Sequence, residues 1–154
     1  IAQNEAQRRS MWARREAAAE ITVGFPGAVD TDVAVPLEAV PSFLKQITAR
    51  VQKIDPEGYE FYLSHLGDGN LHYTFYPSDR SGRFKEPITE AIEDVVLGLQ
   101  GSFSAEHGIG LSKRNSMARR KDPVALEMMR AIKTALDPKN LMNPGKVYPE
   151  PEAR

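Results

Sequence analysis

The sequence contains no cysteine, which excludes thiolate metal ligands, thiol nucleophiles and disulfide bonds. This composition fits a reducing compartment, so we expect a cytoplasmic protein and leave peripheral association with a membrane open. No apolar run approaches the roughly 18 residues that a membrane-spanning helix needs, and the polar first residues do not resemble a signal peptide. Because the chain opens at Ile1 within a helical pattern, we expect it to be a fragment of a longer protein.

Neither sign of charge is in excess, because the formal net charge is −1. Without a basic surplus, binding to nucleic acid is not supported. The short basic cluster Arg119–Lys121 is expected to be the solvated end of a helix. A length of 154 residues, with 41% hydrophobic residues, predicts one domain over residues 1–148. We expect residues 149–154 to be a disordered tail.

Histidine is also scarce: the chain has three, and all lie in two glycine-containing segments. His65 and His72 border residues 65–72 (HLGDGNLH), and His107 lies in residues 104–110 (SAEHGIG). Glycine at such positions lets the backbone come close to another group. This concentration of imidazoles is the main functional signal in the sequence.

Alternating apolar and polar residues over positions 59–76 predict a β-hairpin whose loop is residues 66–71. His65 and His72 would then pair across the base of the hairpin, with Cβ atoms roughly 5 Å apart. Two imidazoles so placed could bind one metal ion, with Glu106 as a third ligand and an open position typical of a catalytic site. The spacing alone is a weak signal, and both histidines could instead be ordinary strand residues.

The remaining elements predict the fold. Helices are expected over residues 2–20, 37–53 and 86–99 and from Pro123 onward, with strands at residues 31–36 and 102–105. This order predicts an α+β protein with a ferredoxin-like βαββαβ antiparallel sheet, helices packed on one face, and terminal helices. The other sheet face, which bears the histidines, would be free to receive another structure.

The sequence predicts the first and the last helix but leaves the surroundings of individual side chains in them open. In the first helix, the arginines could simply face water, or one of them could bind a carboxylate in bidentate fashion. In the last helix, we expect the apolar stripe to be core, including Met128 and Met129. Aromatic residues left on the free sheet face would favour a homodimer that covers them.

Several motifs resemble the C-terminal domain of FAD-linked oxidases. They lie in order at residues 12–16 (WARRE), 32–36 (DVAVP), 65–72, 104–110 with Lys113, and 143–146 (NPGK). The resemblance covers nearly the whole chain. It points to flavoenzymes of the D-lactate dehydrogenase, glycolate oxidase large subunit and D-2-hydroxyglutarate dehydrogenase type.

The resemblance implies a substrate-side domain that works with FAD and a divalent metal, zinc or manganese. His65, His72 and Glu106 would bind the metal, and His107 would be the base that takes the proton of the substrate's α-hydroxyl. Oxidation of a small 2-hydroxy acid would then pass a hydride to FAD.

The resemblance also implies further contacts with substrate and cofactor. Arg15 and Thr74 would contact the substrate, and Asn143 and Gly145 the cofactor. No glycine-rich loop suits the FAD pyrophosphate, so the FAD-binding domain is expected elsewhere in the longer protein, and the isolated chain should be inactive.

The sequence departs from 2-hydroxyglutarate-type members at three positions. Ala19, Asp30 and Thr74 stand where those members carry threonine, lysine and asparagine, which leaves the 2-hydroxy acid unnamed. An alternative function is a non-catalytic ferredoxin-like module that binds a metal or a small acid. A weaker third hypothesis is metal-assisted hydrolysis.

Overall fold

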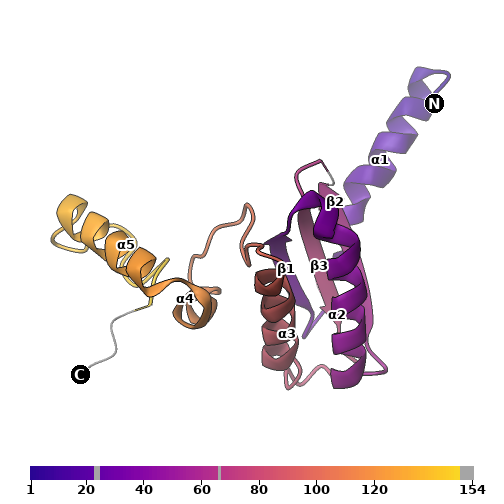
Figure 1. The fold of residues 1–154 in the computed structure, drawn as a ribbon. Coiled ribbons are helices and arrows are strands. Elements are labelled where there is room, and N and C mark those ends of the chain that lie inside the picture. The colour runs from indigo at the N-terminus through magenta and orange to yellow at the C-terminus, as the bar shows by residue number, and fades with distance from the viewer. Residues whose placement is uncertain (23–24, 66, 150–154) are drawn as a thin grey trace.

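A sheet with helices on one face forms the centre of the molecule. The computed structural model describes residues 1–22, 25–65 and 67–149. Within these residues, β1 (Val29–Ala34), β2 (Tyr59–His65) and β3 (Asn70–Tyr76) form one antiparallel sheet in the order β1-β3-β2. Helices α2 (Val40–Ile54) and α3 (Lys85–Gly98) lie side by side on one face of it (Figure 1). The predicted α+β fold is therefore confirmed.

The fourth strand of the predicted plan is reduced to a single bridge. Ala34 and Ser102 exchange two backbone hydrogen bonds, of 2.9 and 2.8 Å, on the edge of β1 that β3 leaves open. The chain then turns, because the Ser102 hydroxyl donates to the carbonyl oxygen of Ser104 at 2.8 Å. The ferredoxin-like order is thus retained, while the segment after the bridge is free to bend across the sheet.

Strand and helix periodicity decide which side chains form the core. Alternate residues of β3, namely Leu71, Tyr73 and Phe75, point toward the helices and are buried. Each helix buries one apolar stripe, which consists of Val40, Phe43, Ile47 and Val51 in α2 and of Ile88, Ile92, Val95 and Val96 in α3. Tyr73 and Phe75 are therefore not on the free face, so they give no reason for a dimer.

Three helices lie beyond this core. Helix α1 (Glu5–Thr22) and the pair α4 (Arg114–Arg120) and α5 (Pro123–Leu136) extend from opposite sides of the sheet (Figure 1). Throughout the described ranges, each helix is too short or too polar for a transmembrane span. Of the tail predicted over residues 149–154, residues 150–154 lie outside the described residues.

The apolar stripe of α5 is not core within the described residues, which corrects our prediction. Val124, Met128, Ile132 and Leu136 are each more than half exposed. The 3.6-residue period does place them on one side of the helix, as predicted. A stripe shows which side of a helix is apolar, but another element must pack on it before it becomes core.

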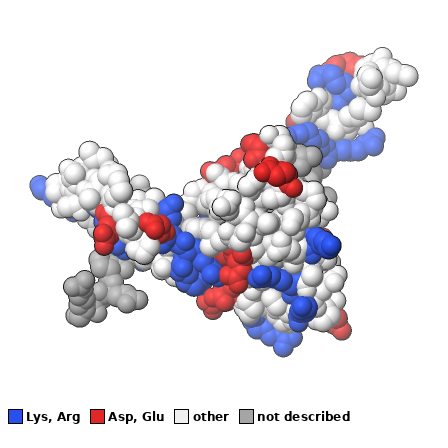
Figure 2. Space-filling view, in the orientation of Figure 1, with Lys and Arg blue, Asp and Glu red and all other residues white. Residues whose placement is uncertain are grey.

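Ion pairs attach α4, for which the sequence analysis predicted an end but no bounds, to α3. Arg119 and Arg120 contact the carboxylate of Glu93 at 3.4 and 3.0 Å, and Ser116 donates its hydroxyl to the same buried group. Arg120 also pairs with Asp94 at 2.8 Å. Figure 2 shows acidic and basic side chains next to one another where α4 approaches α3. The basic cluster does end a helix, as predicted, but it is not simply solvated.

We expect Gly101→Ala to destabilise the domain. A Cβ atom there would lie 2.2 Å from the carbonyl oxygen of Ala34, and relief of that clash would strain the Ser102 bridge. The expected loss is about 2 kcal/mol in the free energy of unfolding, measured by urea denaturation. Gly98→Ala is the control, because its added methyl meets nothing within 4 Å. Equal unfolding midpoints for the two variants would contradict the close packing of Gly101.

Candidate functional site

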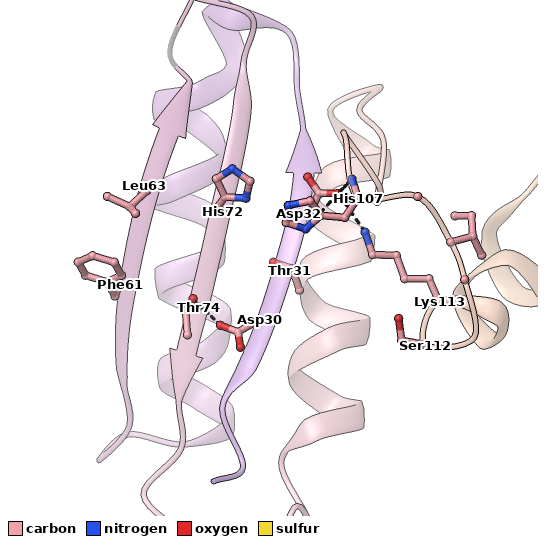
Figure 3. Close-up of a pocket in the computed structure, with 13 residues that line it drawn as sticks. Asp30, Thr31, Asp32, Phe61, Leu63, His72, Thr74, His107, Ser112 and Lys113 are labelled. Carbon is pink, nitrogen blue, oxygen red and sulfur yellow. Dashed lines mark hydrogen bonds and ion pairs between the residues drawn. The ribbon is translucent and has the colours of Figure 1, made fainter. Parts of the chain in front are cut away.

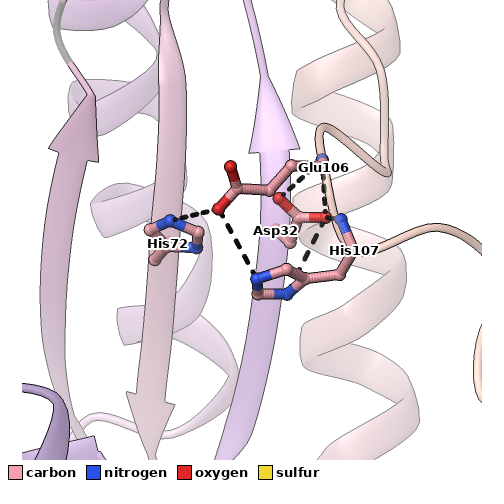
Figure 4. A group of neighbouring side chains, drawn as sticks. All are labelled: Asp32, His72, Glu106 and His107. Carbon is pink, nitrogen blue, oxygen red and sulfur yellow. Dashed lines mark hydrogen bonds and ion pairs between the residues drawn. The ribbon is translucent and has the colours of Figure 1, made fainter.

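The sheet face opposite α2 and α3 carries the functional side chains. The antiparallel register places Asp32 opposite His72 between β1 and β3, and Asp30 opposite Thr74. On the other side of β3, Leu63 lies opposite His72. Figure 4 shows the side chains of Asp32 and His72 in front of the sheet and the two helices behind it. Within the described residues, α2 and α3 thus cover the face opposite the histidines, and the histidine-bearing face has no helical layer, as predicted (Figure 1).

The predicted pairing of His65 with His72 is wrong. β3 begins at Asn70, so the connection is residues 66–69, and His65 lies opposite Asn70. The hairpin closes early because Asp68 donates its amide to the carbonyl oxygen of His65 and accepts a hydrogen bond from the amide of Asn70. His65 and His72 are still diagonal neighbours, with ring centroids 5.4 Å apart.

A cluster of titratable side chains forms on this face. Asp32, His72, Glu106 and His107 each offer one nitrogen or oxygen atom, and these atoms lie within 4.8 Å of one another. One carboxylate oxygen of Glu106, Oε1, lies 3.1 Å from His72 Nε2 and 3.5 Å from His107 Nε2 (Figure 4). The rings of His72 and His107 stack with centroids 5.2 Å apart. Residues more than thirty positions apart in sequence therefore share one site.

The carboxylate of Asp32 holds the loop that carries Glu106 and His107. It accepts the backbone amides of Ala105, Glu106 and His107 at 3.2, 3.1 and 2.8 Å, and Lys113 Nζ lies 3.2 Å away. Burial raises the pKa of Asp32, but the hydrogen bonds from His107, Lys113 and Glu106 outweigh it, so the pKa lies below its usual value. Asp32 is therefore ionised near neutral pH.

Lys113 closes the same loop from its far end. Its ammonium group donates to Ser104 Oγ at 2.8 Å, and Ser104 in turn donates to the carbonyl oxygen of Gly108 at 2.9 Å. Gly108 adopts a φ of +71°, which favours glycine. The sequence analysis assigned no role to Asp32 or Lys113. The available signal was a carboxylate, Asp32, inside the strand predicted at residues 31–36.

A cavity of about 500 Å³ borders the cluster (Figure 3). Its polar walls come from β1, β3 and the loop after the bridge, with Asp30, Thr74, His72, His107 and Lys113. Its apolar wall includes Phe61 and Leu63 of β2 and Ile109. The cavity is large enough for a small organic acid. His72 and His107 both line it.

The other predicted site residues lie in different places. Thr74 lines the cavity and donates its hydroxyl to Asp30 Oδ1 at 2.7 Å. Arg15 does not reach it: its guanidinium stacks over the ring of Trp12, 5.6 Å from the centroid, on the projecting helix α1. Asn143 and Gly145 line a separate cavity of about 240 Å³ beside α5. The contacts predicted for Arg15, Asn143 and Gly145 stay predictions.

The cluster has the chemistry of a divalent metal site. Nitrogen and oxygen ligands lie roughly 2.1 Å from zinc, so two ligands of one ion are at most about 4.2 Å apart. The separations of 3.1 and 3.5 Å from Glu106 to His72 and His107 satisfy this limit. Asp32 is a poorer ligand, because backbone amides and Lys113 already occupy its oxygens. Imidazole and carboxylate donors suit zinc and manganese.

We expect Asp32→Asn to lower the free energy of unfolding by about 2 kcal/mol near pH 7, because the amide cannot satisfy the same donors. Since the pKa of Asp32 in the folded protein lies below the ordinary pKa of an aspartate, its contribution to stability is complete above that ordinary value and is lost as the pH falls through the folded pKa. Urea denaturation at several pH values should therefore show the difference between wild type and variant shrinking in acid.

The control for this prediction is Asp122→Asn. Asp122 caps α5 by accepting the amide of Ala125 at 2.9 Å, and asparagine caps a helix about as well. This variant should unfold like wild type at neutral pH. A pH-independent difference for Asp32→Asn would contradict the assigned charge of Asp32.

Comparison with known proteins identifies the family of this chain. The family model for the C-terminal domain of FAD linked oxidases matches residues 1–147. A D-2-hydroxyglutarate dehydrogenase of Stutzerimonas stutzeri is 33% identical over 153 residues, which are 96% of this chain and 33% of that protein. A probable mitochondrial D-lactate dehydrogenase of Danio rerio is 35% identical over 152 residues, 95% of this chain and 30% of that protein. The chain thus spans about a third of the length of these relatives, and it belongs to the family of FAD-linked oxidase C-terminal domains.

Proposed function

We propose that this chain is the substrate- and metal-binding domain of a flavin-dependent dehydrogenase that oxidises a D-2-hydroxy acid to the 2-oxo acid. The observation that carries the proposal is the meeting of His72, Glu106 and His107 beside a cavity on the open sheet face. Membership of the FAD-linked oxidase family supports it. The names of the relatives include two D-2-hydroxy acids, 2-hydroxyglutarate and lactate.

His72 and Glu106 would hold the metal in this proposal, with His65 turning in as a third ligand from its place beside His72. When bound, a zinc or manganese ion supplies a Lewis acid that lowers the pKa of the substrate hydroxyl. His107 Nε2 would take the hydroxyl proton, because imidazole titrates near physiological pH. His107 is 63% exposed at its side chain, so substrate and solvent can both reach it.

The flavin enters as the electron acceptor. When bound, FAD accepts the hydride that leaves C2 of the substrate. The sequence has no glycine-rich loop for its pyrophosphate, so we propose that another domain of the longer protein binds most of it. Asn143 and Gly145, with φ values of +48° and +68° in a tight turn, would contribute from this chain. Arg15 would bind the substrate carboxylate in this proposal. Because it lies on α1, it would have to approach the cavity from that helix.

The alternative function is a passive metal-binding module. It is supported by the same cluster, because His107 lies as close to the shared oxygen of Glu106 as a metal ligand would. The two functions differ in the role of His107. A base must be free of the metal, whereas a passive site has no use for an unliganded imidazole.

Calorimetric titration of zinc and manganese into the metal-stripped chain tests the site itself. We expect one ion per chain, and at least about ten-fold weaker binding for His72→Ala, because a ligand is lost. His65→Ala should weaken binding similarly if His65 completes the shell. Asp94→Asn, which removes a carboxylate on α3 outside the cluster, is the control and should bind like wild type. Unchanged affinity in His72→Ala would contradict the metal assignment.

The full-length flavoprotein tests the role of His107. We expect His107→Ala to lower the turnover rate by about 10²-fold or more, the usual loss of a general base, while metal content stays near that of wild type. Turnover and metal analysis should be made on the same preparation. Loss of the metal in this variant would instead assign His107 to the coordination shell.

A further inference from the structure

We infer that Asp30 makes this site select 2-hydroxy acids with a single carboxylate and reject those with a second carboxylate on the side chain. The inference rests on the proposed function and adds the substrate class. It makes Asp30 a specificity-determining residue, at the end of the cavity away from the histidine cluster.

The position of Asp30 follows from the strand. It precedes Asp32 by two residues on β1, so both side chains lie on the same sheet face, separated along the strand by about 7 Å. Asp30 lines the same cavity as His72 and His107 (Figure 3). A 2-hydroxy acid held at the histidines, with its side chain extended along β1, would bring its far end to Asp30.

The charge of Asp30 is not neutralised within the described residues. Its hydrogen-bond partner is the hydroxyl of Thr74, a neutral donor, at 2.7 Å. Among the described residues that line the cavity, the one lysine or arginine is Lys113, and it is engaged by Asp32 and Ser104 at 3.2 and 2.8 Å. A second substrate carboxylate would therefore meet a negative charge that no cation offsets among the described residues. Asp30 is exposed, so this repulsion between like charges acts partly through water.

The opposite wall favours an uncharged side chain. Phe61 and Leu63 project from β2 onto the same sheet face and line the cavity with Ile109. These side chains can bury methylene and methyl groups of a substrate. Asp30 can in addition accept a hydrogen bond from a substrate hydroxyl. The cavity thus fits a 2-hydroxy monocarboxylate with an apolar or hydroxylated side chain.

Two matched substrates and one substitution test this inference. In the full-length flavoprotein, kcat/KM is measured for D-2-hydroxypentanoate and D-2-hydroxyglutarate, which differ at C5 by a methyl and a carboxylate. We expect wild type to prefer the pentanoate. Asp30→Asn keeps an acceptor for Thr74 and should shift the ratio about ten-fold toward the glutarate, equivalent to roughly 1.4 kcal/mol. Asp30→Lys should shift it further in the same direction.

Glu38→Gln is the control, because it removes one exposed negative charge outside the cavity and should leave the ratio unchanged. Thermal unfolding of each variant confirms that it is folded. Preference of wild type for the glutarate, or an unchanged ratio in Asp30→Asn, would overturn the role of Asp30 while the proposed function stands. Failure of wild type to oxidise any 2-hydroxy acid would overturn both.

Discussion

The buried carboxylate of Asp32 is the interaction on which the site depends. Glu106 and His107 lie on a loop without regular structure, and three consecutive backbone amides of that loop donate to Asp32. Hydrogen bonds to an ionised acceptor are stronger than neutral ones, and Lys113 balances the charge. Asp32 itself sits rigidly on β1, opposite His72. One strand residue therefore sets the distance between the two halves of the cluster.

The layering of the fold makes this arrangement accessible. Helices α2 and α3 bury one face of the sheet, so the side chains that alternate with the core residues all point to the open face. The single bridge between Ala34 and Ser102 pairs the chain with the edge of β1, and the residues after Ser102 leave that edge. A longer fourth strand would carry residues 104–107 along the edge instead of across the face. The short bridge thus places a loop, rather than a strand, over His72.

The open face and the exposed stripe of α5 are features of a domain that forms part of a larger protein. The chain spans about a third of its relatives, and large apolar surfaces usually mark places where something else packs. In the proposed enzyme, the flavin would approach the cavity from its open side. Specificity would then come from this chain, because Asp30, Thr74 and the apolar wall of β2 surround the space available to the substrate side chain.

The sequence by itself determined most of the elements, the α+β class, the family and three of the cluster residues, His72, Glu106 and His107. Periodicities of 2 and 3.6 residues are local properties, and histidine is scarce enough here to mark a site. Only the tertiary structure decided the hairpin register, the role of Asp32 and the exposure of the α5 stripe. Register depends on where a turn closes, and the role of Asp32 depends on amides that approach it from more than seventy residues away. Whether an apolar stripe is buried likewise depends on whether another element packs on it.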